Sequence, residues 1–284
     1  MNYQDFRTQQ HSFQSSNGNI KYIDKGKGDV IVLLHGIPTS SWLYRKMIDE
    51  LAENYRVIAP DMLGFGSSDS PKGYDVYQPK EHAKRLLELM NSLQIQTWSH
   101  VFHDAGGLWT WELFKQAPEK INKLIILNTI IYKEGFSPPI RFKKGFIARC
   151  VMAMYSNGMT TNAMLKGLFK TGLVDDDIMT KSDIEGYKKP LLEGKTKAMY
   201  QFFSNTCNTL PDYSETIKSI KIPKILIWGK HDDFLVFDKM KDKVISSLEL
   251  TPNRVNLIEG KHFIQEEKPK EINALILKFI KSDS

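Results

Sequence analysis

Short apolar runs recur along the chain at the spacing expected of buried strands. Each run holds four or five residues, and most are rich in valine, isoleucine and leucine. Continuous apolar runs of this length are typical of strands that are buried on both faces of a parallel sheet. We therefore predict strands at residues 30–34, 56–59, 100–103, 124–128, 224–228 and 254–258.

Amphipathic segments separate several of these runs. In residues 81–93 and 269–280 the leucines and isoleucines recur at helical spacing. Strands that alternate with helices predict an α/β protein with a mostly parallel sheet, right-handed crossovers and helices on both faces. The earlier residues 11–16 and 20–24 flank the Asn17-Gly18 pair, which predicts an antiparallel hairpin at the sheet edge.

The alternation stops between about residues 130 and 216, where helical stretches with glycine and proline replace the strand signals. We interpret this segment as a helical cap, inserted after the strand that ends at Asn128. The predicted division is a core in residues 1–129 and 217–284, with the cap in residues 130–216. Methionines and aromatics in the cap suit the adaptable wall of an apolar pocket, and equally the ordinary packing of a small helical subdomain. They include Met152, Met154, Met159, Met164, Met179, Met199, Phe142, Phe146, Phe169, Phe202 and Phe203.

The composition limits the cofactors and partners that the chain can have. Its two cysteines, Cys150 and Cys207, lack metal-ligand spacing and its seven histidines form no metal-binding pair, so we expect free thiols, no metal and no cofactor. The net charge is +6, but lysine pairs such as Lys143-Lys144 are scattered along a chain rich in acids, which favours a solvated surface over nucleic-acid binding. The amino-terminal residues resemble no signal peptide and no apolar run is long enough to span a bilayer. We therefore expect a cytoplasmic protein with no membrane partner.

The segment Val101-Phe102-His103-Asp104-Ala105-Gly106-Gly107 follows a predicted strand and opens a predicted helix. A nucleophile elbow needs this context, because a tight turn with small neighbours lifts one side chain above the carboxyl edge of the sheet. Asp104 occupies the position of the nucleophile, although an aspartate at this place could also be a helix N-cap. No serine occupies the apex, since Ser99 lies before it, so a serine esterase is the least favoured enzyme.

A second loop and two late residues complete the pattern of a catalytic site. The backbone amides of Ile37, in the His35-Gly36-Ile37-Pro38 loop, and of Ala105 are the predicted oxyanion donors. Asp232 and His262 each follow a late strand, in the chain order of an acid and a base. Asp233 is the close competitor for the acid, while His35 is expected to have a structural role and His231 to be an exposed loop residue.

These motifs resemble the α/β-hydrolase superfamily, and within it the branch of epoxide hydrolases and haloalkane dehalogenases. The similarity covers most of the chain outside the cap, in residues 35–45, 61–75, 103–107, 228–232 and 260–269. The resemblance implies that Asp104 is the nucleophile, Asp232 the acid and His262 the base, with Ile37 and Ala105 as the oxyanion amides. It implies an alkyl-enzyme ester on Asp104, cleaved by water that His262 activates, and a small apolar electrophile as substrate.

The chain departs from the family at the positions that handle the leaving group. Haloalkane dehalogenases place side-chain N–H donors where this chain has Ile37 and Ala105, so a halide would need cap donors such as Asn205 or Asn208. Epoxide hydrolases use cap tyrosines as proton donors, and the candidates here are Tyr155, Tyr200 and Tyr213, with Tyr187 also available. We therefore favour epoxide hydrolysis. Haloalkane dehalogenation, hydrolysis or decarboxylation of a lactone, and a non-catalytic binding protein are the alternatives, in a monomer or a homodimer.

Overall fold

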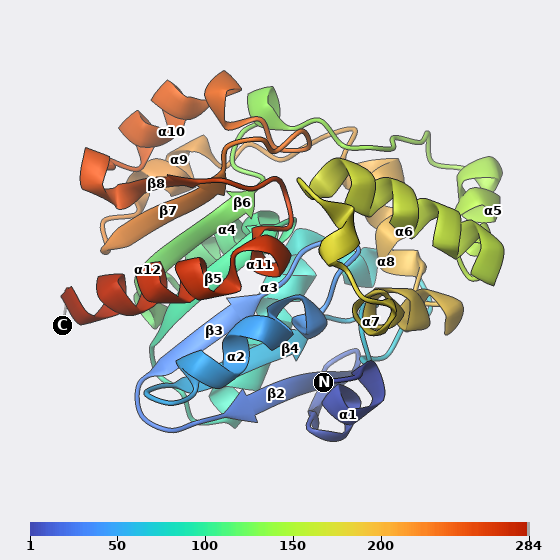
Figure 1. The fold of residues 1–284 in the computed structure, drawn as a ribbon, viewed down its shortest axis with the longest axis horizontal. Helices are drawn as coiled ribbons and strands as arrows, with labels where there is room; N and C mark the ends of the chain where they lie inside the picture. The colour runs from blue at the N-terminus through green and yellow to red at the C-terminus, as the bar shows by residue number, and fades with distance from the viewer. Residues whose placement is uncertain (283–284) are drawn as a thin grey trace.

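The computed structural model describes residues 1–282 and contains one eight-stranded sheet (Figure 1). The strand order is β1-β2-β4-β3-β5-β6-β7-β8. The pairs β1–β2 and β2–β4 are antiparallel, and all other neighbours are parallel. The strands are β1 (His11–Ser15), β2 (Gly18–Lys25), β3 (Val30–Leu34), β4 (Arg56–Asp61), β5 (Trp98–Asp104), β6 (Ile121–Thr129), β7 (Lys224–Gly229) and β8 (Val255–Ile258).

The six strands predicted from apolar runs all form, and the predicted α/β class is confirmed. The run at residues 30–34 becomes β3 with the predicted bounds, while β5 begins at Trp98 and ends at Asp104. All seven residues of β5 are buried, as expected for a central strand with helices on both faces. The predicted hairpin is the pair β1–β2, in which Ser15 lies opposite Gly18.

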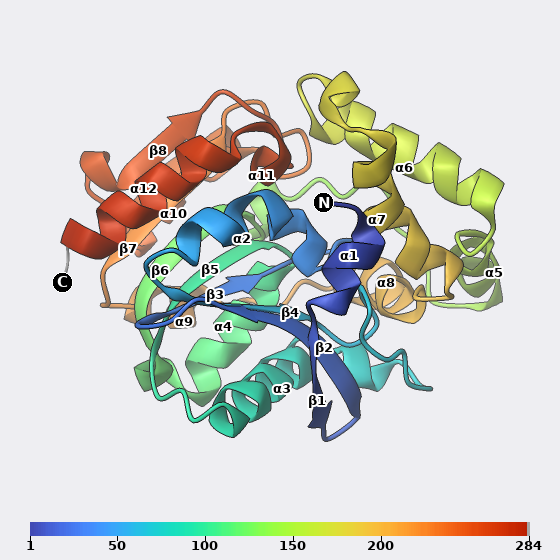
Figure 2. The same cartoon turned by 60° about the horizontal axis from the view of Figure 1, so that its bottom comes forward.

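Helices cover both faces of the sheet. Helices α2 and α12 lie on one face, and α3, α4 and α9 lie on the other (Figure 2). Helix α12 shows why its sequence is helical, because Ile272, Ile276, Phe279 and Ile280 form one buried stripe at helical spacing. The α-helices are α1 (Tyr3–Thr8), α2 (Arg45–Leu51), α3 (Pro79–Ser92), α4 (Gly106–Gln116), α5 (Phe146–Met154), α6 (Gly158–Gly172), α7 (Lys181–Leu192), α8 (Lys197–Gln201), α9 (Ser214–Ser219), α10 (Lys241–Ser247), α11 (Ile264–Glu267) and α12 (Pro269–Ser282).

Four helices between β6 and β7 gather at one end of the molecule, on the right in Figure 1. We call α5, α6, α7 and α8 the cap helices. A π-helical turn, Phe202–Thr206, follows α8 directly. The cap was predicted to end at residue 216, and this position lies inside α9. The division into core and cap at residues 130 and 216 stays a prediction. No helix in the described part of the chain combines the length and apolar character needed to cross a membrane.

Candidate active site

Asp104 is the last residue of β5 and begins the turn into α4. Its φ is +50°, a left-handed conformation that few non-glycine residues adopt and that short polar side chains tolerate best. The turn also needs small neighbours: a Cβ atom on Gly106 would lie 2.7 Å from the carbonyl oxygen of His35, and one on Gly107 would lie 2.3 Å from Oγ1 of Thr129. Tight packing of this kind is what a nucleophile elbow requires.

Two backbone amides lie at the carboxylate of Asp104. The amide of Ile37 donates to Oδ2 at 2.7 Å, and the amide of Ala105, the next residue, lowers the pKa of the same carboxyl. Gly36 makes room for this contact, since a Cβ atom on it would lie 2.4 Å from Oδ2. The structure therefore brings the two predicted oxyanion amides to the same carboxylate.

His35 is the first residue of the loop that carries Ile37, and its ring makes contacts other than with Asp104. Its Nδ1 lies 2.7 Å from the carbonyl oxygen of Gly36, and the amide of Met62 donates to its Nε2 at 3.0 Å. Burial lowers the pKa of His35 to about 4, so the ring stays neutral and joins two loops. This geometry fits the structural role expected for His35.

His262 lies between two carboxylates. Its Nδ1 is 2.9 Å from Oδ2 of Asp232, and its Nε2 is 3.8 Å from Oδ1 of Asp104. Asp232 is in turn fixed by three donors: the amides of Phe234 and Leu235 donate to Oδ1 at 2.8 and 3.0 Å, and the Asn128 side chain donates to Oδ2 at 2.6 Å. His262, Asp232 and Asn128, which lie in or after three different strands, thus form one hydrogen-bonded relay next to Asp104.

The competing residues lie outside this relay. Asp233 is exposed, and its carboxylate is 3.5 Å from Nζ of Lys261. His231 is also exposed and contacts Glu259 at 3.1 Å. The geometry therefore favours Asp232 over Asp233 as the partner of His262.

Burial and neighbouring charges shift the pKa values of the central pair upward. Burial raises the pKa of the Asp104 carboxyl, although His262 and the amides of Ile37 and Ala105 lower it. Burial alone would lower the pKa of His262, but the carboxylates of Asp232 and Asp104 leave it raised above 6.5.

Two adjacent apolar chambers lie near Asp104, and the inner one contains its side chain in the wall. The inner chamber has no polar side chain in its described wall other than those of Asp104 and His262. The outer chamber shares part of this wall, namely Pro38, Pro139, Leu168, Phe203 and Phe234. The inner chamber is completed by Ile37, Phe136, Pro138, Phe202 and Phe263. The outer chamber is completed by Ile140, Tyr155, Ala163, Met164, Gly167, Thr171 and Met199.

Tyr155 is the one cap candidate that lies in the wall of these chambers, and Tyr200 and Tyr213 do not. The Tyr200 hydroxyl accepts a hydrogen bond from the amide of Gly145 at 3.2 Å, and its ring packs 4.4 Å from that of Tyr74. Cap packing therefore turns Tyr200 away from the chambers, so the prediction that it donates a proton there is not supported.

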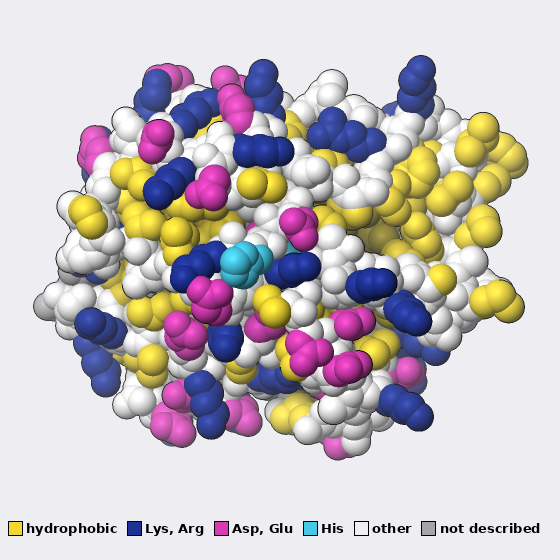
Figure 3. Space-filling model, turned by 45° about the horizontal axis from the view of Figure 1, so that its top comes forward, with side chains coloured by type: hydrophobic (Ala, Val, Ile, Leu, Met, Phe, Trp, Pro, Cys, Tyr) yellow, Lys and Arg dark blue, Asp and Glu magenta, His cyan; other side chains and the backbone are white. Residues whose placement is uncertain are grey.

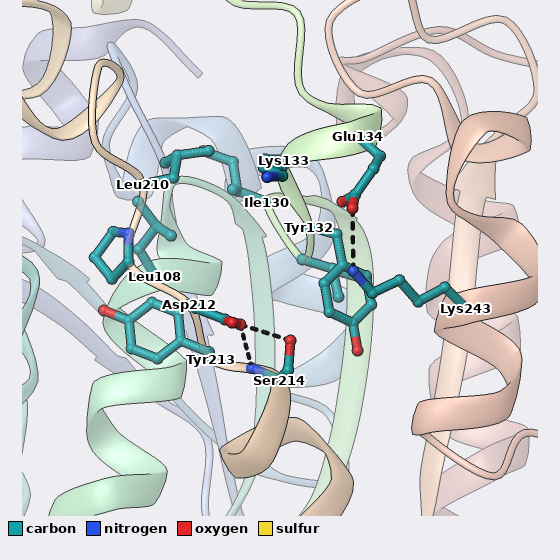
Figure 4. Close-up of a pocket in the computed structure, with 12 residues that line it drawn as sticks. Leu108, Ile130, Tyr132, Lys133, Glu134, Leu210, Asp212, Tyr213, Ser214 and Lys243 are labelled. Atoms are coloured by element: carbon teal, nitrogen blue, oxygen red, sulfur yellow. Dashed lines mark hydrogen bonds and ion pairs between the residues drawn. The ribbon is translucent and has the colours of Figure 1, made fainter.

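Tyr213 belongs to a separate surface pocket, shown in Figure 4. The loop after β6, the segment before α9 and one residue of α10, Lys243, line this pocket. Three of its four charged groups already have partners, since Lys243 is 3.2 Å from Glu134 and Asp212 accepts from Ser214. The Tyr213 hydroxyl donates to Glu112 at 2.8 Å, which commits it to a structural contact outside the chambers.

The remaining cap candidates also have other contacts. The Tyr187 hydroxyl donates to Glu266 at 2.5 Å, and the Asn208 side chain donates to the carbonyl oxygen of Phe142 at 2.7 Å. Asn205 lies in the π-helical turn and does not line either chamber. Within residues 1–282, the carboxylates of Asp175, Asp176 and Asp177 could reach one metal ion, but all three are exposed and none lines a chamber.

Sequence reasoning missed the buried ion pair that supports the His262 loop. Arg45 donates to Glu266 at 2.5 and 2.8 Å, and to Asp183 of α7 at 2.5 Å. Lys46 adds a contact to Glu266 at 2.9 Å. Arg45 and Glu266 both lie within the motifs that carry the family resemblance, which marks the two positions but not the contact between them.

His103 and Asn128 also support the relay and were not assigned this role from the sequence. The Nε2 of His103 is 2.9 Å from the carbonyl oxygen of His262, and the Asn128 side chain contacts Asp232 and the amide of Gly229. A polar residue at the carboxyl end of a predicted strand was the available signal for Asn128.

Comparisons with known proteins show which family the chain resembles. Residues 29–147 match the family described as alpha/beta hydrolase fold. The chain is 29% identical over 283 residues to haloalkane dehalogenase 2 of Mycobacterium tuberculosis, covering 93% of this chain and 92% of the relative. It is 30% identical over 250 residues to a cis-3-alkyl-4-alkyloxetan-2-one decarboxylase of Shewanella oneidensis, covering 80% of this chain and 74% of the relative. A solved epoxide hydrolase from Vigna radiata shares the fold, with a TM-score of 0.75 at 20% identity over 96% of this chain and 98% of that chain.

The chain therefore belongs to the α/β-hydrolase family, in the branch that contains the epoxide hydrolases and haloalkane dehalogenases. It is a hydrolase, like the relatives named haloalkane dehalogenase and epoxide hydrolase, and the expectation of an enzyme is confirmed.

Proposed function

We propose that Asp104 attacks a small apolar electrophile and that His262 then activates the water that releases the product. The observation that carries this proposal is the arrangement around one carboxylate: Ile37 holds Oδ2 at 2.7 Å, while Oδ1 faces His262 Nε2 at 3.8 Å. Oδ1 is therefore the oxygen with a free lone pair for attack on carbon. A carboxylate nucleophile suits such an attack because the resulting ester can be cleaved by water.

The second step uses the relay from His262 to Asp232. The imidazole takes a proton from water, and the hydroxide attacks the carbonyl carbon of the ester on Asp104. The amides of Ile37 and Ala105 then stabilise the oxyanion, a contribution that typically is worth about 2.7 to 4 kcal/mol per donor. Collapse of this species transfers the proton from His262 to the departing alcohol and leaves Asp104 as the carboxylic acid, with one oxygen from water. The acid then loses its proton to His262 and on to solvent, which regenerates the carboxylate.

An epoxide is the substrate that we favour. Opening an epoxide ring leaves an alkoxide that needs a proton, and Tyr155 is the cap tyrosine in the wall of the outer chamber. Burial raises the pKa of Tyr155, which keeps its hydroxyl protonated until the alkoxide forms. A halide is less well supported, because Ile37 and Ala105 offer no side-chain donor and Asn205 and Asn208 lie outside the chambers.

A strained lactone is the second candidate, and one specific observation favours it. The described wall of the inner chamber has no proton donor besides His262, and a lactone that opens to a carboxylate needs none, because a carboxylate is stable as an anion near neutral pH. The similarity to the oxetanone decarboxylase of Shewanella oneidensis agrees with this candidate.

Single-turnover reactions in water enriched in heavy oxygen test the proposal. Hydrolysis of an ester on Asp104 should place one heavy oxygen in the peptide that contains Asp104, detectable by mass spectrometry of the digested protein. The matched control is the same reaction with the Asp104→Asn variant, whose side chain tolerates the left-handed conformation but cannot attack. If product forms while the Asp104 peptide stays unlabelled, Asp104 is not the nucleophile of a hydrolytic reaction.

The expected cytoplasmic location and the expected monomeric or homodimeric state both stay predictions. Light scattering on the purified protein measures the oligomeric state directly.

A further inference from the structure

The residues from 135 to 174, which include α5 and α6, carry the whole net charge of the chain. This segment contains six basic residues and no acidic one, whereas the chain has 39 Lys and Arg and 33 Asp and Glu. The rest of the chain therefore has equal numbers of basic and acidic residues. The scattered arrangement of charge expected from the sequence does not hold in residues 135–174. The six cations are Arg141, Lys143, Lys144, Arg149, Lys166 and Lys170, all exposed.

These cations are not used in ion pairs. Within residues 1–282, none of the six has a carboxylate within ion-pair distance, while lysines elsewhere on the surface pair with acids, such as Lys221 with Glu249 and Lys230 with Glu259. Unpaired basic groups in a segment without acids create a positive field that attracts an anionic partner.

The same segment exposes large apolar side chains. Five of the eight large hydrophobic side chains that are exposed in the described chain lie in it, and Phe146, Ile147 and Met159 are 76%, 78% and 81% exposed. Figure 3 shows hydrophobic side chains gathered over this end of the molecule, beside a hollow in the surface. Exposed apolar groups of this size, rimmed by charge, are typical of an interaction surface. We call residues 135–174 the basic apolar face.

Helix α5 is apolar on both sides. Ala148 and Met152 are buried against the protein, while Phe146, Cys150 and Met154 recur at helical spacing on the exposed side. A helix with a second, outward apolar stripe and flanking lysines has the pattern of a helix that lies at a membrane interface.

The outer chamber opens within the same face. Tyr155, Met164, Leu168 and Thr171 all belong to the segment and line that chamber, and Thr171 is exposed. A partner that covers this face would therefore also cover the entrance to the apolar route toward Asp104.

We propose that the basic apolar face docks on an anionic lipid surface, so that apolar substrate enters the outer chamber directly from the bilayer. Lysines contribute attraction to anionic headgroups, and Phe146 and Ile147 can insert at the interface. A second copy of the chain is a poorer occupant, because a symmetric contact would bring two such positive faces together. The expectation of no membrane partner rested on the lack of a spanning segment, which does not bear on surface docking. The inference does not require Asp104 to be the nucleophile.

Sedimentation with lipid vesicles tests this proposal on the whole protein without substrate. Wild type should bind vesicles of phosphatidylcholine with phosphatidylglycerol, bind phosphatidylcholine alone more weakly, and lose binding as salt rises. The Lys143→Glu/Lys144→Glu variant should lower the partition coefficient by roughly thirtyfold, from about a fivefold effect for each lysine that is lost. Phe146→Ser/Ile147→Ser should also lower it, with an unchanged circular dichroism spectrum because both side chains are exposed.

The matched charge control is Lys27→Glu/Lys278→Glu, which makes the same change in net charge at exposed lysines outside the basic apolar face. This control should bind vesicles nearly as wild type does. Absence of vesicle binding by wild type, or equal loss in the two charge variants, would overturn the proposal. So would a wild-type dimer that Phe146→Ser/Ile147→Ser dissociates in the absence of any vesicle binding, because that result would identify a second copy as the occupant. A failure here would leave the heavy-oxygen test of Asp104 unaffected.

Discussion

His262 and Asp104 face each other without a hydrogen bond, since Nε2 and Oδ1 are 3.8 Å apart. Because Asp232 accepts from Nδ1, the neutral imidazole carries its proton there and presents a lone pair at Nε2. A lone pair and a carboxylate oxygen cannot hydrogen-bond to each other, but both can contact one water. In the proposed mechanism, this separation leaves Oδ1 free for the attack on substrate and Nε2 free to activate water.

This separation of roles predicts the behaviour of His262→Ala. Attack by Asp104 should remain, whereas hydrolysis of the ester should slow by roughly 10²-fold or more, since general-base assistance is lost. An adduct should then accumulate on Asp104 and be visible in the mass of the intact protein. The exposed His231→Ala is the matched control and should turn over as wild type does. Normal turnover of His262→Ala would show that the base is misassigned.

The charges around His262 predict a particular pH dependence. In the free enzyme the carboxylates of Asp232 and Asp104 raise its pKa above 6.5 against the burial that lowers it, so the protonated form persists to higher pH. In the ester, Asp104 has lost its charge, so the pKa of His262 should fall. Hydrolysis needs the neutral ring, so its rate should increase with rising pH. The midpoint of this increase should lie at a lower pH than the midpoint of the His262 titration in the free enzyme.

Two measurements check this ordering. Rates of ester hydrolysis are recorded in single turnovers between about pH 5 and 9, and the His262 ring is titrated by NMR in the free enzyme. A hydrolysis rate that does not change with pH, or that rises only above the titration of the free enzyme, would contradict the assignment of His262 as base.

The core of the site was accessible to sequence reasoning because each of its residues ends a strand or follows one closely. Apolar runs locate β5, β7 and β8, and parallel strands bring their carboxyl ends to one edge, which is why Asp104, Asp232 and His262 meet. The structural neighbours of these residues were not accessible in this way. Arg45 and Glu266 are separated by 221 positions, and no local pattern marks that contact.

The cap tyrosines show a different limit of the sequence. Helical periodicity indicates that the cap is helical, but the rotation of each helix depends on packing with the core. Tyr200 packs on Tyr74 of the loop before α3, and Tyr213 is held by Glu112 of α4. These tertiary contacts, and not residue type, distinguish Tyr155 from the other two candidates.

Tyr155→Phe tests the choice of an epoxide. If Tyr155 protonates the alkoxide, the variant should lose roughly 10²-fold in the rate of epoxide opening, because it lacks a general acid. Opening of a lactone to a carboxylate should change little. Tyr200→Phe is the matched control, since its hydroxyl accepts from the amide of Gly145 outside the chambers. Full epoxide activity in Tyr155→Phe, measured by rapid mixing, would rule out Tyr155 as the proton donor.

The buried ion pair of Arg45 predicts a large effect on stability. Arg45 is only 9% exposed and joins Glu266, four residues after His262, to Asp183 of the cap helix α7. Replacing Arg45 by alanine leaves two carboxylates without this partner in a site with little water, where loss of one member of a buried pair typically costs about 3 to 5 kcal/mol. We expect Arg45→Ala to lower the free energy of unfolding by about 3 kcal/mol, the lower end of that range, because Lys46 remains near Glu266.

Urea unfolding followed by circular dichroism measures this free energy. Arg56→Ala is the control, and loss of its partly exposed ion pair should cost at most about 1 kcal/mol. Equal losses in the two variants would mean that the Arg45 cluster has no special role in holding α7 and the His262 loop together.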